Sequence, residues 1–520
     1  MHTSLNAARR AIELDELAGG QPVDILVIGG GVTGAGIALD AASRGLSVAL
    51  IEAKDLAFGT SRWSSKLVHG GLRYLASGEL SVAHESAAER HVLMTRTAPH
   101  LVRTLPQLIP LTERISPARR ALLRSGLRAG DLLRRAAGTP SAILPGPRQV
   151  PAAEALALAP CLRRDELRGG LLSFDGALVD DARLVVTLAR TAAGFGARIL
   201  TRMEATRADG DRVAVRDTLT GQHAELRARV VLNAAGVWAG RLTDAVRLCP
   251  SRGSHLVLDG ASLGLSSTAL TVPIPGESSR FVLVLPQPDG RVYLGLTDEP
   301  LDGEIPDVPA VPDSDTDFLL DVASTVLARR LTRADVLGSF AGLRPLVEGA
   351  GSSRSADLSR KHAIVGSPNG VLTAVGGKLT TYRKMAQDAV DAAVRAAGLH
   401  AGPAQTKRIP LAGAAPRTNL STVDAPARLI AKYGTEAPRV AAVGELDPDL
   451  AVPIAPGSPI TAAEVVFAVR HEGALDVQDV LDIRTRLGLV AEQAEAARPV
   501  IAELVERCLT GLTGDAPATR

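Results

Sequence analysis

The chain is poor in cysteine and in long apolar runs. Its 520 residues include three cysteines, which are far apart and form no C-x-x-C pair, so we expect neither a disulfide framework nor a cysteine metal site. No run of about eighteen uncharged apolar residues occurs, which predicts that no helix crosses a membrane. The first twenty residues are charged and have no apolar core, which argues against a secretory signal and favours a cytoplasmic protein.

Further absences narrow the chemistry. The sequence has no H-x-x-x-H, H-E-x-x-H or Cys/His cluster, so no metal is expected, and it has no G-x-S-x-G elbow of a hydrolase. The net charge of +2 argues against a dedicated nucleic-acid binder. Aromatic residues make up 2% of the chain, so Ala, Val and Leu must form the core. The length predicts two or three domains.

The most informative segment that is present runs from Asp24 to Glu52 and reads DILVIGGGVTGAGIALDAASRGLSVALIE. An apolar strand leads into Gly29, Gly31 and Gly34, spaced G-x-G-x-x-G, and a helix and a second apolar strand follow. This order is typical of a dinucleotide-binding unit, in which the glycines let the backbone approach a pyrophosphate. Glu52 would accept hydrogen bonds from a ribose. The unit alone does not distinguish NAD from FAD.

Three later stretches place small or basic residues in loops. Residues 232–236 (LNAAG) end a strand with small side chains and are similar to the second glycine signature of two-dinucleotide-fold flavoproteins, which favours FAD. Residues 64–74 (SSKLVHGGLRY) and 376–384 (GGKLTTYRK) suit close approach to a ligand. Four cations could form one anion pocket, or each could be a surface ion-pair partner: Arg73, Arg344, Arg360 and Lys378.

A single histidine, His255, follows a glycine at the start of a predicted strand. A lone histidine is often structural, but imidazole is also the natural base for an alcohol near neutral pH. His255 is therefore a candidate for proton transfer.

Two helical regions complete the pattern. A helix over residues 117–137 places six arginines in one half of its helical wheel and Leu122, Leu132 and Leu133 mostly in the other; the arginines are residues 119, 120, 124, 128, 134 and 135. Beyond a linker, Thr461 and Glu464 form a capping box at the start of a helical tail.

Seven motifs of the chain occur in the order seen in the FAD-dependent glycerol-3-phosphate dehydrogenases, and the chain resembles that family. The motifs are GGGVTGAGIALDAASRGLSVALIE, SSKLVHGGLRYL, VDDARLV, GSHLVL, GLTD, GLRPL and GGKLTTYRK. The resemblance covers residues 24–395 and extends to the helical tail. It implies an α/β FAD-binding Rossmann-like domain of the two-dinucleotide-fold type, with a mostly β substrate or cap domain and a C-terminal all-α domain. We expect an N-terminal extension (1–20), an FAD-binding domain (21–104, 175–249 and 335–400), a cap domain (105–174 and 250–334) and a helical domain (405–515).

The resemblance also implies an activity: oxidation of sn-glycerol 3-phosphate to dihydroxyacetone phosphate, with hydride transfer from C2 to FAD and electrons passed to a quinone. It places His255 and Arg344 at the reacting alcohol, and it places Arg73, Tyr74, Arg360 and Lys378 around the phosphate. A base and a nearby cation suit loss of the C2 hydroxyl proton. The residues implied in FAD binding are Gly29, Gly30, Gly31, Thr33, Gly34, Glu52, Ser64, Ser65, Lys66, His69, Gly70, Ala235, Gly236, Gly377, Lys378, Leu379 and Thr380.

Members of this family bind membranes from one side, so the arginine face of residues 117–137 could contact anionic lipid. The alternative is a solvated basic helix or an ion-pair surface between domains. The resemblance also leaves room for a homodimer. Two other functions fit the nucleotide-binding unit: an FAD-dependent amine or 2-hydroxy-acid oxidase, and a non-catalytic nucleotide-binding module.

Overall fold

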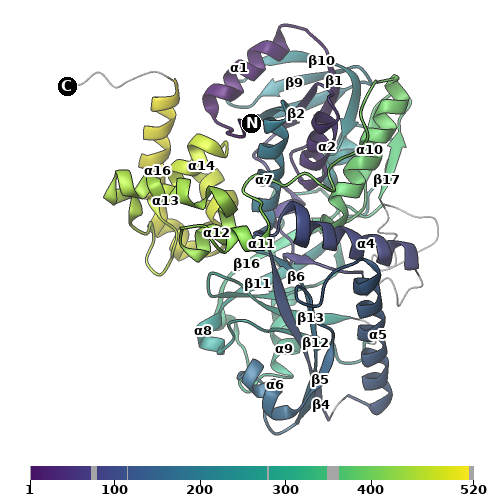
Figure 1. Ribbon diagram of the computed structural model, residues 1–520, viewed down its shortest axis with the longest axis vertical. Coiled ribbons are helices and arrows are strands. Elements are labelled where there is room, and N and C mark those ends of the chain that lie inside the picture. The colour runs from purple at the N-terminus through teal and green to yellow at the C-terminus, as the bar shows by residue number, and fades with distance from the viewer. Residues whose placement is uncertain are drawn as a thin grey trace.

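The computed structural model describes residues 2–71, 79–113, 115–277, 280–301, 303–347 and 362–513. Two β-sheets lie one above the other in Figure 1, and the C-terminal helices pack beside both of them. The expected fold class is confirmed: the first sheet carries the nucleotide-binding topology, the second is mostly antiparallel, and the chain ends in helices.

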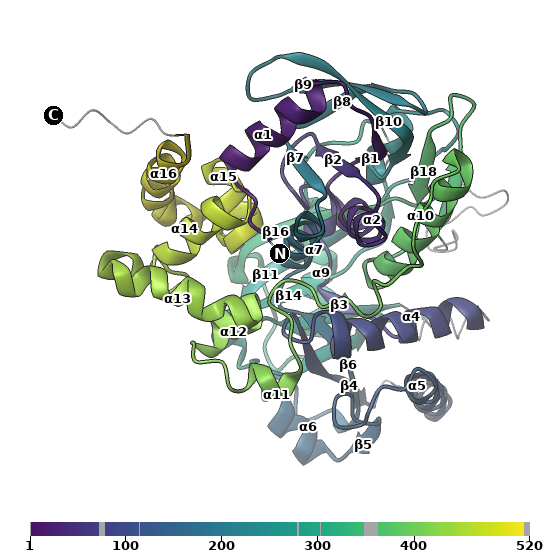
Figure 2. The same cartoon turned by 45° about the horizontal axis from the view of Figure 1, so that its top comes forward.

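The first sheet has the strand order β17-β18-β10-β1-β2-β7, with β8 and β9 attached through β10. Strands β10, β1, β2 and β7 run parallel, and the predicted strand–helix–strand unit is β1, α2 (Val32–Ser43) and β2. Helices α7 (Asp181–Gly194) and α10 (Tyr382–Ala397) pack on either side of α2 (Figure 2). The strands are β1 Val23–Ile28, β2 Val48–Glu52, β7 Arg198–Thr201, β8 Met203–Ala208, β9 Arg212–Asp217, β10 His223–Asn233, β17 Ala363–Gly366 and β18 Leu372–Val375.

The second sheet has the order β15-β11-β14-β13-β12-β4-β6-β3, with β16 paired to β11 and β5 paired to β6. All of its pairings are antiparallel except β12 with β4. Because β16 pairs with β11, this sheet extends beyond the expected end of the cap segment at residue 334. The strands are β3 Leu67–Val68, β4 Val102–Thr112, β5 Arg148–Val150, β6 Leu167–Leu178, β11 Ser251–Asp259, β12 Ala269–Pro273, β13 Phe281–Pro286, β14 Arg291–Gly295, β15 Glu299–Pro300 and β16 Val336–Arg344.

The remaining helices before the C-terminal part lie around the two sheets (Figure 1). Helix α1 contacts β7 and β10 of the first sheet, while α6 and α9 pack on the second. Helix α4 contacts α5 along the side of the molecule. Their bounds are α1 Ala7–Ala18, α4 Leu80–Val92, α5 Pro117–Ala136, α6 Ala152–Leu158, α8 Gly260–Leu263 and α9 Asp313–Ser324.

The arginine half of α5 is divided between the surface and the interior: Arg124, Arg128 and Arg135 are exposed, whereas Arg134 is buried. In α5, Leu122 and Leu132 are 65% and 64% exposed, whereas Leu123 and Leu127 pack against the apolar cluster under β4 and β6. Leu123 and Leu127 are partly buried and lie in the arginine half of the wheel, so only part of that half faces the protein. Arg134 is accordingly buried, and it donates to Asp131 and to a backbone carbonyl.

The C-terminal helices form their own apolar cluster. The predicted capping box is confirmed: Thr461 and Glu464 each accept a backbone N–H of the other at the start of α14. No helix among the described residues is both long and apolar enough to span a bilayer. The helices are α11 Arg417–Leu420, α12 Ala427–Tyr433, α13 Ala437–Leu446, α14 Ala462–His471, α15 Val477–Asp479 and α16 Ala491–Thr513.

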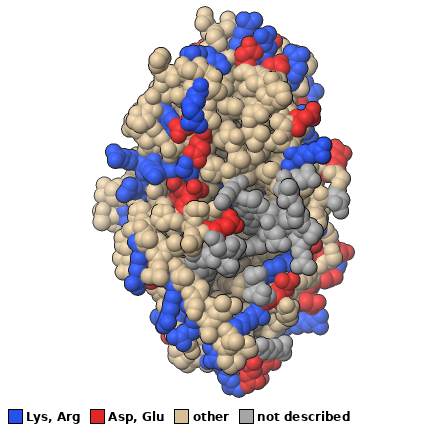
Figure 3. Space-filling model, turned by 90° about the vertical axis from the view of Figure 1, so that its right-hand side faces the viewer, with Lys and Arg blue, Asp and Glu red and all other residues tan. Residues whose placement is uncertain are grey.

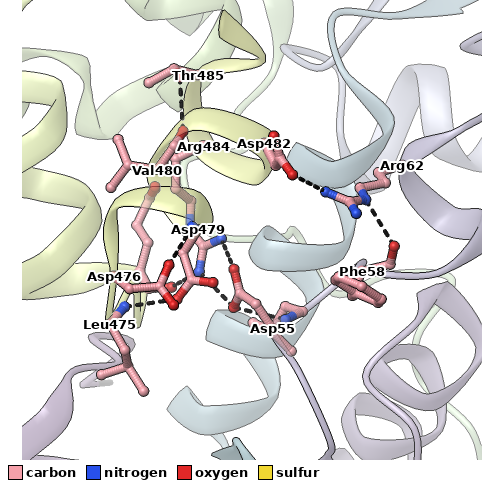
Figure 4. A network of polar contacts seen from close by, with 12 residues as sticks. Asp55, Phe58, Arg62, Leu475, Asp476, Asp479, Val480, Asp482, Arg484 and Thr485 are labelled. Atoms are coloured by element: carbon pink, nitrogen blue, oxygen red, sulfur yellow. Dashed lines mark hydrogen bonds and ion pairs between the residues drawn. The ribbon is translucent and has the colours of Figure 1, made fainter. Parts of the chain in front are cut away.

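A buried ionic network joins these helices to the first sheet (Figure 4). Arg484 donates to both carboxylate oxygens of Asp55, at 2.5 and 3.1 Å, and both side chains are almost fully buried. Arg62, in the loop after β2, donates to Asp482 at 2.8 Å. Removing one partner of such a pair would leave an uncompensated buried charge, which typically costs about 3–5 kcal/mol. The loop after β2 is therefore fixed by the C-terminal part of the chain.

Candidate functional site

A cavity of about 690 Å³ lies where the two sheets meet. It opens at the carboxyl ends of β1, β2, β10 and β18, and it extends to β11 and β16 of the second sheet. Ligand sites in open α/β sheets form at this end of the strands. The predicted site residues that line it are Gly29, Gly31, Thr33, Glu52, Ser64, Ser65, His69, Ala235, Gly236, His255, Arg344, Gly377, Lys378, Leu379 and Thr380.

The glycine turn after β1 requires glycine for two different reasons. Gly29 has a φ of +109°, and a Cβ there would lie 2.6 Å from the Ala234 carbonyl oxygen. A Cβ on Gly34 would lie 1.9 Å from the Gly29 carbonyl oxygen, so this residue allows α2 to pack against the turn. Gly31 is the N-cap residue of α2 and lines the cavity. The turn thus brings the N-terminus of α2, which attracts anions, to the cavity wall.

Glu52 ends β2 at the edge of the same cavity. Its Oε2 accepts the Gly30 N–H at 2.6 Å, and its Oε1 accepts the Lys54 N–H at 2.8 Å. Burial raises the pKa of Glu52, and the two backbone N–H groups oppose that rise. Gly30 itself does not line the cavity, and its role is to hold the carboxylate in place.

The structure does not bring Lys66 to the cavity. Its side chain is 2% exposed, and Nζ lies 2.5 Å from Asp181 Oδ1 and 3.5 Å from Asp180 Oδ2. Burial alone would raise the pKa of Asp181, but the Lys66 ammonium, with Arg486, outweighs it and holds that pKa below its usual range. Gly34 and Gly70 also lie outside the cavity lining, and a Cβ on Gly70 would clash with the Arg90 guanidinium.

His255 lies in the cavity wall on β11 and stacks on Phe340 of the neighbouring strand β16. The two ring centroids are 4.7 Å apart, with the planes 8° from parallel. His255 Nε2 is 2.9 Å from Ser65 Oγ. Burial lowers the pKa of His255 to about 3, and the positive charges of Arg344 and Lys66 act in the same direction. The imidazole is therefore neutral at ordinary pH.

Arg344 ends β16 and lies across from the start of β11. Its guanidinium donates to the Thr297 carbonyl at 3.1 Å, to Asp298 at 3.1 Å and to Ser251 Oγ at 3.2 Å. These contacts fix a cation in the wall that also carries His255. His255 and Arg344 thus line the same cavity.

The predicted phosphate residues are only partly described. Lys378 lines the cavity, and its Nζ donates to Ser86 Oγ of α4 at 2.8 Å. Arg73, Tyr74 and Arg360 lie outside the described residues, so their predicted role is untested.

Sequence reasoning missed both tryptophans of the chain, Trp63 and Trp238, which line the cavity. Trp63 stacks on Phe340, with 5.7 Å between ring centroids. Trp238 lies against Gly59, where a Cβ would come within 2.8 Å of its ring. The chain has only two tryptophans, and both lie at this cavity. Their scarcity was the signal that could have marked them as candidate site residues.

Comparison with known proteins agrees with this geometry. The family of FAD dependent oxidoreductases matches residues 24–383, and the C-terminal domain of alpha-glycerophosphate oxidase matches residues 404–510. Glycerol-3-phosphate dehydrogenase 1 of Mycobacterium tuberculosis is 52% identical over 510 residues, covering 97% of this chain and 99% of that protein. The mitochondrial glycerol-3-phosphate dehydrogenase of Arabidopsis thaliana is 33% identical, covering 91% of this chain and 81% of that protein.

A solved structure also matches nearly the whole chain. It is the glycerol-3-phosphate dehydrogenase from Bacillus halodurans complexed with FAD, with a TM-score of 0.73 and 28% identity, covering 98% of this chain and 96% of that one. The FAD-binding part and the C-terminal part of the fold are thus both found in one group of proteins. The chain belongs to the FAD dependent oxidoreductases and, within them, to the glycerol-3-phosphate dehydrogenase family.

Proposed function

We propose that this protein uses FAD to oxidise sn-glycerol 3-phosphate to dihydroxyacetone phosphate. One observation carries the proposal: a single cavity joins a nucleotide-binding glycine turn to a neutral histidine, an arginine and a lysine. The activity printed in the names of the similar dehydrogenases supports it.

The residues at the cavity wall fit FAD. Gly29 and Gly31 leave room for a pyrophosphate at the start of α2, and Glu52 lies where an adenosine ribose would reach it. The backbone at Gly236 and Gly377 comes close to the cavity without side chains. Bound FAD would supply a ring that accepts a hydride from C2 of the substrate.

His255 and Arg344 would act on the substrate alcohol. The neutral imidazole can accept the proton of the C2 hydroxyl, and the Arg344 guanidinium can stabilise negative charge that develops on that oxygen. An imidazole with a pKa of about 3 is a weak base. The proton is therefore expected to move as the C2 hydrogen departs, rather than in an earlier step.

Lys378 would bind the substrate phosphate, together with Arg73, Tyr74 and Arg360. Phosphate binding is remote from the chemistry, so its contribution is to hold C2 in a reactive position. The Lys378–Ser86 contact links this lysine to α4, which gives it a fixed direction at the cavity wall.

Anaerobic spectroscopy tests the proposal. The purified protein should carry the absorption of oxidised flavin, and sn-glycerol 3-phosphate should bleach it while glycine and lactate do not. Bleaching by an amine or a 2-hydroxy acid alone would favour the oxidase alternative. A protein that takes up no flavin from added FAD would contradict the proposal entirely.

The rate of flavin reduction at saturating substrate should be flat between about pH 8 and pH 5. A base must be unprotonated to act, and an ordinary histidine with a pKa of about 6.5 would lose roughly tenfold in rate per pH unit below that value. Because burial lowers the pKa of His255 to about 3, its neutral form persists throughout this range. Stopped-flow measurements across the range check this, and a tenfold fall per unit below pH 6.5 would contradict it.

Replacing Lys378 with methionine should weaken substrate binding by about ten- to hundredfold, because a charge-assisted hydrogen bond to the phosphate is lost. FAD content should be unchanged. The dissociation constant from anaerobic titration gives the readout. Lys384→Met is the matched control, since this lysine belongs to the same motif but pairs with Asp388 and does not line the cavity. Equal affinities in the two variants would remove Lys378 from the phosphate site.

We further propose that a quinone accepts the electrons and that α5 contacts the membrane surface. The outward face of α5 exposes Leu122 and Leu132 beside Arg124, Arg128 and Arg135, a combination suited to insertion among anionic lipids. Figure 3 views the side of the molecule on which α4, α5 and α10 lie, and basic and acidic side chains are interspersed there. Membrane contact would therefore depend on the leucines as well as on charge. A homodimer remains a prediction.

Vesicle co-sedimentation tests the α5 surface. The double variant Leu122→Ser/Leu132→Ser should lose most of its binding to vesicles that contain phosphatidylglycerol. Leu446→Ser/Val452→Ser is the control, since these exposed apolar residues lie in the C-terminal part of the chain, at the end of α13 and in the segment before α14. Binding that survives the α5 change, or that falls equally in the control, would exclude α5 as the contact.

A further inference from the structure

His255 offers only one nitrogen toward the cavity. Its Nδ1 is buried, while its Nε2 faces Ser65 Oγ at 2.9 Å. The ring stacks on Phe340, and its Cδ2 edge is packed against Gly295, where a Cβ would lie 2.3 Å from Cδ2. Because Nδ1 is buried and Nε2 contacts the Ser65 hydroxyl, that hydroxyl offers a path for a proton from the cavity to the imidazole.

We propose that Ser65 is a catalytic residue that relays the proton of the substrate C2 hydroxyl to His255 Nε2. This inference rests on the proposed function. The substrate proton moves to Ser65 Oγ while the proton of Ser65 moves to Nε2, and Nδ1 carries the ring's other proton. The C2 hydrogen leaves with its electron pair to FAD, and the C2–O bond becomes a carbonyl. Two electrons reach FAD and one proton reaches the imidazole, so the step balances.

The geometry around Ser65 is suited to such a relay. Ser65 lines the cavity and its Oγ lies 2.9 Å from His255 Nε2, so the hydroxyl can contact both a substrate in the cavity and the imidazole. A hydroxyl can donate and accept at once, which a relay requires. The short path from cavity to base also explains how a histidine that is only 2% exposed can take part in the chemistry.

A buried carboxylate positions this hydroxyl. Asp181 Oδ2 accepts both the N–H of Ser64 (2.9 Å) and its hydroxyl (2.7 Å), and Oδ1 accepts the Lys66 ammonium (2.5 Å). Residues 64–66, which we term the strap, are thus held on both sides of Ser65. Lys66 has a φ of +58°, which is an unusual backbone conformation for a residue other than glycine. The ion pair between Lys66 and Asp181 holds the residue in this conformation. Asp181 does not line the cavity, so it is a positioning residue.

Two nearly isosteric replacements separate the hydroxyl from its bulk. Ser65→Thr keeps the hydroxyl and adds a methyl group. Ser65→Val matches the threonine side chain in shape but has no hydroxyl. We expect the flavin reduction rate at saturating sn-glycerol 3-phosphate to fall by about a hundredfold in Ser65→Val and by only a few-fold in Ser65→Thr. The rates are compared in protein fully loaded with FAD, because Ser65 is also implied in FAD binding, and the substrate dissociation constant should be close to the wild-type value in both. Equal rates in Thr and Val variants would overturn the proposal.

A second comparison tests the positioning role without changing Ser65. Asp181→Asn removes the charge that holds the strap, and Glu464→Gln removes a comparable buried charge that pairs with Lys432 at 2.9 Å in the C-terminal helices. Both should lower Tm, but only Asp181→Asn should slow flavin reduction. In a Ser65→Val background, Asp181→Asn should cause little further slowing, because it acts through Ser65. Parallel effects of the two acid variants on rate, or full additivity, would overturn the role of Asp181.

The wild-type protein separates this inference from the function on which it rests. A wild-type flavin that sn-glycerol 3-phosphate does not reduce would overturn both. A wild-type flavin that is reduced, with Ser65→Val equally fast, would keep the function and overturn the relay alone.

Discussion

The buried Asp181 and its neighbour Asp180, at the start of α7, are the constraint on which the site depends, because three parts of the molecule meet there. Asp181 belongs to the helix layer of the first sheet, and the strap that it holds leads directly into β3 of the second sheet. Arg486, from the C-terminal helices, lies 3.4 Å from Asp180 and donates to the Arg62 carbonyl. The cavity lies between the two sheets, so its shape depends on the contacts that Asp180 and Asp181 make with the strap and with Arg486.

The C-terminal helices therefore contribute to the site without lining the cavity. Their acidic and basic side chains bind Arg62, Asp55 and Arg202, all of which lie in loops at the ends of first-sheet strands (Figure 4). Buried pairs of this kind add little net stability but fix geometry, since each charge finds a partner in only one arrangement. None of the described residues of the C-terminal helices lines the cavity. These helices instead hold the loop after β2 in place.

Local patterns could be predicted from the sequence, and contacts distant in the chain could not. The segment from Asp24 to Glu52 contains its strands, turn and helix within thirty residues, so spacing alone determined it. Lys66 was expected to contact the cofactor because its motif is glycine-rich, but its partner Asp181 is 115 residues away. The packing of Leu123 in α5 could not be predicted for the same reason, since the apolar cluster that it contacts includes residues of β4 and β6. The roles of Arg73 and Arg360 remain predictions.

The central claim is that the C2–H bond of sn-glycerol 3-phosphate breaks in the step that reduces the flavin. Stopped-flow reduction by sn-glycerol 3-phosphate that carries deuterium at C2 tests it most directly. The account predicts that the deuterated substrate reduces the flavin more slowly at saturation, with an unchanged dissociation constant. Identical rates for the two substrates would contradict it, because the C2–H bond would then not break in the step that reduces the flavin.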